Sequence, residues 1–145
     1  MVNDSRIGIY DYIYGLLYGV VTENVYSMNE PQELTESDTR DGFIVIIVGD
    51  LYDLSEFEGH TYGYARVYVN AYVPPMTRGR LDFEKYQEYE TAINDVIKNA
   101  TDTPNTDYYI QQGSVLSMDG VSDSNANNSY YMFTKSFIVV IDKQE

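Results

Sequence analysis

The chain has no cysteine, no tryptophan and a single histidine, His60. Without cysteine it can form no disulfide, no thiolate nucleophile and no zinc site built on sulfur. One histidine leaves almost no material for a metal site built on imidazole ligands or for a Ser-His triad. These absences exclude several common catalytic arrangements, and no residue pattern in the chain indicates an enzyme.

Long apolar runs and basic residues are also scarce. No apolar run reaches the ~20 residues that cross a bilayer as a helix, and Met1–Arg6 is polar, so we expect neither a membrane-spanning helix nor a signal peptide. The 23 acidic residues outnumber the 9 Lys and Arg and give a net charge of -14. Because a phosphate backbone is bound through clustered cations, this balance disfavours sequence-specific nucleic-acid binding and binding to anionic membranes.

The chain does contain enough apolar material for one core, together with an unusual amount of tyrosine. Hydrophobic residues make up 43% of the 145 residues, which predicts a single domain over 1–145. Tyrosine occurs 16 times, against 5 phenylalanines. Because tyrosine combines a broad ring with a polar tip, it is enriched at protein interfaces.

The clearest pattern is the strict alternation of Tyr62–Val73, which is typical of a β-strand with two different faces. One face is small and apolar and suits a position beneath a helix. The other face carries Tyr62, Tyr64, Arg66, Tyr68, Asn70 and Tyr72. It is too aromatic for bare solvent and too polar for a core, so we predict that its tyrosines and its arginine form an interface. The alternative is that the tyrosines pack against loops of their own chain.

The other elements follow from their periodicity. Helices are predicted at Ser5–Tyr18 and Leu81–Ala100, where apolar residues recur at spacings of three and four. Further strands are predicted at Val20–Met28, Gly42–Val48, Tyr108–Met118 and Ser129–Ile141. This order gives an α+β fold, a mostly antiparallel sheet of four or five strands with both helices on one face. The other face then has no covering layer from its own chain and is expected to contact a partner.

The connections carry the charged candidates. Two of them, Asn29–Asp41 and Asp50–His60, are predicted to be exposed acidic loops, and the second is too long for a tight hairpin. The loop Met76–Arg80 carries Arg78 and Arg80. We expect these arginines to pair with an acidic patch on a neighbouring copy, and the alternative is a solvated turn.

Two interpretations from other classes of protein stay open. Asp50, Asp53 and Glu58 are carboxylates of the kind that hold Mg²⁺ or Mn²⁺ in hydrolases. Such spacing is common by chance in so acidic a chain, so we favour a solvated loop and expect no catalytic residue, metal site or cofactor. The third interpretation is an adaptor protein that binds a peptide by strand addition, which the residues alone do not separate from an interface protein.

The element order resembles that of a known group of proteins. Val25-Tyr26 follows the first helix, Pro74-Pro75 precedes an acidic amphipathic helix, and a hairpin ends in Phe137–Ile141. In this the chain resembles the small tail-terminator, or tail-completion, and neck-ring proteins of tailed bacteriophages. The similarity spans nearly the whole chain and lies in topology and element lengths. The Tyr-rich, Asn-rich and acidic composition is also similar to that of proteins from crAss-like phages.

The resemblance implies a non-catalytic structural protein of the virion neck or tail, made in the infected bacterial cytoplasm. Such proteins form hexameric or dodecameric rings beside portal, neck or tail proteins, and DNA passes through the ring. The acidic residues of the two loops would then face the channel: Glu33, Glu36, Asp38, Asp50 and Asp53. An acidic channel repels the phosphate backbone, which lets DNA slide without sticking.

Overall fold

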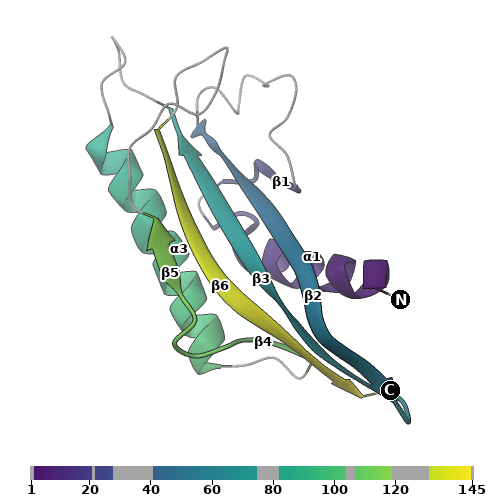
Figure 1. Cartoon of the computed structure of the whole chain (residues 1–145). Helices are drawn as coiled ribbons and strands as arrows, with labels where there is room; N and C mark the ends of the chain where they lie inside the picture. The colour runs from purple at the N-terminus through teal and green to yellow at the C-terminus, as the bar shows by residue number, and fades with distance from the viewer. Residues whose placement is uncertain are drawn as a thin grey trace.

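The computed structural model describes residues 2–20, 22–27, 41–74, 82–103, 107–118 and 131–144. Within these residues the chain forms two helices, α1 (Val2–Leu17) and α3 (Phe83–Asp102), and six strands (Figure 1). The strands are β1 (Val25–Ser27), β2 (Phe43–Phe57), β3 (His60–Val73), β4 (Tyr108–Ile110), β5 (Leu116–Met118) and β6 (Tyr131–Gln144). The element order and the α+β class agree with the prediction.

All the described strands belong to one sheet, in the order β1-β2-β3-β6-β4, and β5 also pairs with β6. The β1–β2 pair is parallel and the other pairs are antiparallel, so the sheet is mostly antiparallel, as predicted. The central strand is β3, which pairs with β6 in continuous register from His60↔Gln144 to Val73↔Tyr131.

The sheet has more strands than the four or five expected because the predicted strand Tyr108–Met118 is interrupted. The chain turns between β4 and β5, where Gly113 has φ +79 and the Ser114 N–H donates to the carbonyl oxygen of Gln111 at 3.2 Å. The turn leaves Ile138 of β6 between the two short strands. Its N–H donates to Ser114 Oγ at 3.0 Å and its carbonyl accepts from the Gln111 N–H at 2.8 Å.

The largest difference from the prediction concerns Asp50–His60, which is not a long loop. Strand β2 continues to Phe57, and only Glu58 and Gly59 form the turn to β3. Their φ values of 50 and 78 suit a two-residue hairpin turn of type I′. Register shifts between Val48 and Leu51 and between Tyr52 and Ser55 mark two bulges in β2. Each bulge adds a residue to the strand, which interrupts the period-two pattern by which a strand is recognised.

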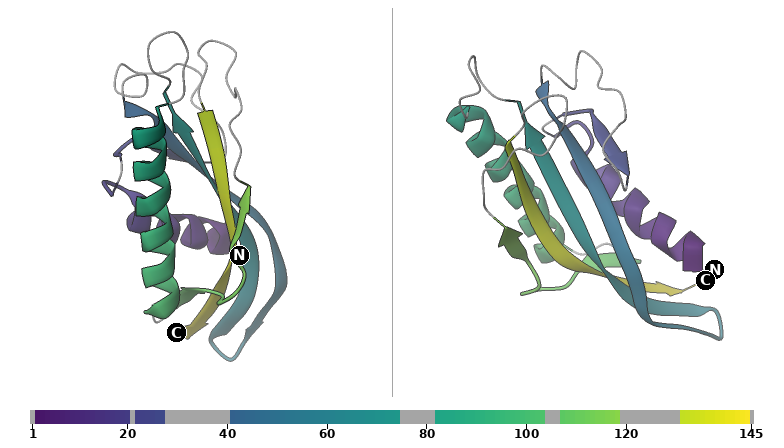
Figure 2. Two further views of the ribbon diagram at one scale, coloured as in Figure 1. Left: turned by 90° about the vertical axis from the view of Figure 1, so that its left-hand side faces the viewer. Right: turned by 45° about the horizontal axis from the view of Figure 1, so that its top comes forward.

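Both helices pack on one face of the sheet, as predicted (Figure 2). The face of β3 predicted to lie beneath helices is buried along its whole length: Gly63, Ala65, Val67, Val69, Ala71 and Val73. The helices cover it with side chains spaced three or four residues apart: Ile9, Ile13 and Leu17 of α1 and Tyr89, Ile93, Ile97 and Ala100 of α3. Burial of each large side chain stabilises the fold by roughly 1.5–3 kcal/mol.

We call the opposite side of the sheet the open face; its β3 residues are Tyr62, Tyr64, Arg66, Tyr68, Asn70 and Tyr72. The expectation that its own chain leaves this face uncovered is wrong at one end. There Phe43, Val45 and Tyr72 form a second buried cluster. Phe43 and Tyr72 are directly opposite in the β2–β3 pair, and their rings stack with centroids 4.5 Å apart.

A partly buried ion pair ties α3 to the sheet. Lys135 of β6 points to the helix side and is 2% exposed. Its Nζ donates to Glu90 Oε2 on α3 at 3.1 Å and to Ser117 Oγ on β5 at 2.8 Å, and it lies 5.7 Å from the centroid of the Phe133 ring. One cation therefore connects a helix and two strands.

Close packing at the start of β2 requires a glycine. Gly42 has φ +87, and a Cβ there would contact the carbonyl oxygen of Tyr72 and lie 2.9 Å from Tyr89 Oη. We expect Gly42→Ala to lower the free energy of unfolding by roughly 2–5 kcal/mol, from backbone strain and overpacking. Gly15→Ala, in open space on α1, should raise it by up to ~1 kcal/mol. Urea denaturation measures both, and equal effects would contradict this account.

Two substitutions compare the loss of the negative charge of the Glu90–Lys135 pair with the loss of its positive charge. Glu90→Gln replaces the carboxylate that Lys135 Nζ contacts with a neutral amide, and we expect a loss of roughly 1–3 kcal/mol in the free energy of unfolding. Lys135→Met replaces the cation with an apolar side chain of similar length, and we expect a value within ~1 kcal/mol of the parent. Thermal and urea unfolding measure the difference. A larger loss for Lys135→Met than for Glu90→Gln would mean that the pair itself is strongly stabilising.

Candidate functional site

The most distinctive surface is a hairpin that extends past the end of α3 (Figure 1; Figure 2, right). It comprises residues 49–64, which we call the arm. Large apolar side chains on it remain in water: Phe57 at the tip is 74% exposed and Tyr52 is 55% exposed. The same segment contains Asp50, Asp53, Glu56 and Glu58 and has no Lys or Arg. Exposed aromatic rings on a paired hairpin are typical of contact surfaces.

Local contacts give the base of the arm a defined shape. Asp53 lies in the second bulge with φ 52, a conformation that aspartate tolerates better than most residues. Its carboxylate lies near the Tyr64 phenol, and its negative charge raises the pKa of that phenol. The rings of Tyr52 and Tyr64 stack with centroids 5.8 Å apart. The bulge therefore places an acid and two tyrosines together on the arm.

A second polar group lies where β3 meets the end of β6. His60 Nε2 is 2.5 Å from Asp142 Oδ1, and both side chains are partly exposed. Burial raises the pKa of Tyr109, and the nearby Tyr62 and Asp142 raise it further. These residues come from β3, β4 and β6, so the arm is joined to the body of the sheet by polar contacts.

Farther along the open face the predicted interface residues differ in exposure. Tyr62 is 39% exposed, and Tyr64, Arg66 and Tyr68 are half-buried. Tyr72 is only 4% exposed and packs in the second cluster. For Tyr72 the expected exposure is wrong, because its ring stacks on that of Phe43, its direct partner across the β2–β3 pair. Tyr26, Ile47 and Met132 pack against the same cluster.

The other predicted residues divide into two groups. Asp50 and Asp53 are exposed on the arm, on a strand and not on a loop. The remaining ones lie outside the described residues: Glu33, Glu36, Asp38, Arg78 and Arg80. Sequence reasoning missed Tyr52 and Phe57 as candidates. The available signal was the apolar series Leu51, Leu54 and Phe57 inside a segment interpreted as an acidic loop.

Along the long strands β2 and β6, the described residues leave little open edge for an added strand. Strand β1 pairs with β2 only from Ile44 to Ile46, and Arg6 NH2 on α1 donates to the next outward carbonyl, Val48 O, at 2.6 Å. Beyond Val48, the bulges and acidic residues of β2 are features that discourage edge-to-edge pairing. The other edge of β6 is paired with β4 and β5. This geometry favours side-chain contacts over strand addition.

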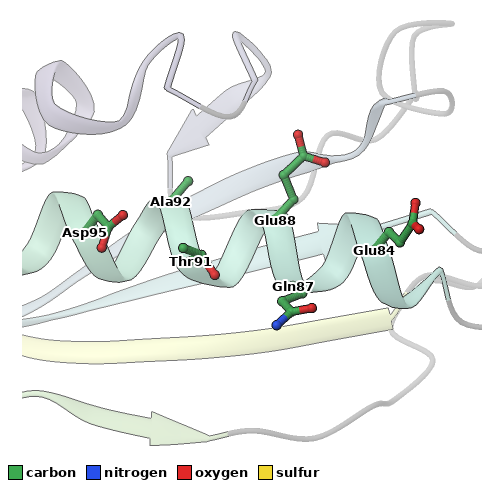
Figure 3. Close-up of a pocket in the computed structure, with 6 residues that line it drawn as sticks. All are labelled: Glu84, Gln87, Glu88, Thr91, Ala92 and Asp95. Carbon is green, nitrogen blue, oxygen red and sulfur yellow. The ribbon is translucent and has the colours of Figure 1, made fainter.

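No other described feature forms a built site. The outer side of α3 has a shallow depression, lined by Glu84, Gln87, Glu88, Thr91, Ala92 and Asp95 (Figure 3). All six come from one helix, so the depression is that helix's solvated side. Among the described residues, which include Asp50, Asp53 and Glu58, no three His, Asp or Glu side chains are grouped so that they could hold a metal ion. In the same residues, neither helix is long and apolar enough to span a membrane.

Two comparisons with known proteins, one with family models and one with curated sequences, give no match. No protein-family model matches the chain, and no curated protein sequence matches it. The function is therefore inferred from the geometry of the arm and the open face, from charge and from the resemblance in element order.

The contact between Asp53 and Tyr64 can be tested by titration. Asp53→Asn removes the negative charge beside the phenol, so we expect the pKa of Tyr64 to fall toward its ordinary value. NMR of ¹³C-labelled tyrosine follows each ring, and Tyr64→Phe assigns the signal. Glu56→Gln makes the same change of charge elsewhere on the arm and should shift that pKa less. Equal shifts from the two variants would argue against the contact.

Proposed function

We propose that this protein is a non-catalytic structural subunit that forms a ring at the head-tail junction of a tailed bacteriophage, as a neck connector or a tail terminator. The observation that carries the proposal is the arm, which keeps Phe57 and Tyr52 in water on a hydrogen-bonded hairpin. Exposed apolar surface of this kind is costly in a monomer and useful at a contact between proteins. The interface would include Tyr62, Tyr64, Arg66 and Tyr68 on the open face.

The layered architecture supports this proposal. In the ring proteins that the chain resembles, helices pack on the outside and sheets of adjacent subunits approach one another. Here both helices lie on one face of the sheet, and the open face carries half-buried tyrosines. The net charge of -14 suits a channel that DNA crosses without binding. We place the protein in the virion neck or tail after assembly in the bacterial cytoplasm, beside portal, neck or tail proteins.

The proposal predicts assembly, which sedimentation velocity measures. We expect the purified protein to form a hexamer or dodecamer, or to join heads or tails that lack it. Repulsion between subunits of this net charge opposes association, and salt screens that repulsion. We therefore expect moderate salt to raise the association constant by roughly several-fold. A protein that stays monomeric with heads, tails and each neighbouring virion protein would contradict the function.

A calorimetric control addresses the hydrolase interpretation. Titration with Mg²⁺ or Mn²⁺ should give no binding heat, and Asp53→Asn should leave assembly intact if its carboxylate only orients Tyr64. Metal binding that disappears in Asp53→Asn would favour the hydrolase. Weakening of assembly by salt would instead mean that specific ion pairs dominate the contact.

A further inference from the structure

The tip of the arm is complementary to a surface that offers a cation beside apolar side chains. The tip presents Phe57 between Glu56 and Glu58, and no Lys or Arg lies anywhere in residues 49–64. Two carboxylates that flank an exposed ring favour a surface with one basic group and neighbouring apolar side chains. Most of this strongly acidic protein's surface would repel them.

The centre of the open face has these properties. Arg66 lies there half-buried, and its NH1 donates to the neutral Ser136 Oγ at 2.8 Å. Among the described residues no carboxylate pairs with this guanidinium. Tyr64 and Tyr68 flank it along β3, and Ile138 is directly opposite on β6; all three are half-buried. A carboxylate from another molecule could therefore pair with the Arg66 guanidinium, which has no acidic partner among the described residues.

The tip of the arm cannot reach the Arg66 of its own chain. Phe57 is paired with His60, which is six residues from Arg66 along the same strand, a distance of about 20 Å. His60 and Arg66 belong to the same continuous strand, so the tip of the hairpin cannot fold back onto the open face of its own chain. Only a second molecule can bring the two surfaces together.

We infer that the arm of one copy docks on the open face of a second copy, with Phe57 against Tyr68 and Ile138 and with Glu56 or Glu58 beside Arg66. Each copy carries both surfaces, and the charges are complementary although the whole protein is acidic. This inference rests on the proposed function, since it specifies how the ring subunits would join. The contact joins two different surfaces, so successive copies can associate head-to-tail, and this arrangement closes into a ring when the rotation between neighbours allows it.

A pair of matched variants tests the apolar part of the contact. Phe57→Ser removes the exposed ring at the tip of the arm, and Phe83→Ser removes an equally exposed ring on α3, since both residues are 74% exposed. Sedimentation equilibrium of the full chain should show association at least ~10-fold weaker for Phe57→Ser and unchanged for Phe83→Ser. Unchanged association of Phe57→Ser, or equal weakening of both, overturns the inference.

Charge reversal tests the polar part. Arg66→Glu should weaken association, and combining it with Glu56→Lys and Glu58→Lys should restore most of the loss, because the pair is then reversed. Circular dichroism checks that each variant is folded. A folded triple variant that associates no better than Arg66→Glu contradicts the pairing.

The absence of cysteine allows a direct test in which Phe57 and Arg66 both stay in place. Chains with Glu58→Cys and chains with Ile138→Cys are purified separately and mixed with a short bis-maleimide. A head-to-tail contact predicts a cross-linked dimer in the mixture and little in either variant alone. Equal cross-linking in all three samples, or none in the mixture, overturns the inference.

The outcomes distinguish this inference from the proposed function. Wild-type protein that is monomeric at millimolar concentration contradicts docking between copies, whereas the function is judged by assembly with heads, tails and neighbouring virion proteins. Rings that form normally from Phe57→Ser and Arg66→Glu chains would leave the function standing and overturn the role of the arm.

Discussion

The fold depends on the pairing of β3 with strands on both sides while one of its faces stays small and apolar. Ala65, Val67 and Val69 let two helices approach the same stretch of backbone, and their burial accounts for much of the core. The residues between them cannot reach that core, because successive side chains of a strand point to opposite faces. The tyrosines and Arg66 are therefore directed to the open face by the same alternation that builds the core.

The elements with uninterrupted periodicity could be predicted from the sequence. Both helices were located within three residues at each end, and β3 was located because nothing breaks its alternation. The second half of β2 could not be located in this way. Its bulges shift the side-chain period twice, and its aspartates and glutamates have low strand propensity. The division of the predicted strand Tyr108–Met118 into β4 and β5 depends on contacts with Ile138, a residue distant in sequence.

The candidate site could be predicted only in part, for a related reason. Alternation identified Tyr62, Tyr64 and Tyr68 as residues outside the helix-covered core, but it could not distinguish them from Tyr72. The burial of Tyr72 requires Phe43 to be its cross-strand partner, and that register is a tertiary property. Phe57 was missed because its exposure follows from a hairpin turn placed at Glu58 and Gly59. Without that turn, the segment has the composition of an ordinary acidic loop.

The two bulges in β2 have a consequence for symmetry. Bulges bend a strand and increase its twist, so they set the direction in which the tip leaves the rest of the sheet. In an assembly where the tip of each subunit contacts the body of the next, that direction fixes the rotation between neighbours. The rotation in turn decides how many subunits close the circle. Removing a bulge residue could then leave the contact intact while changing the diameter of the assembly or opening it into a helix.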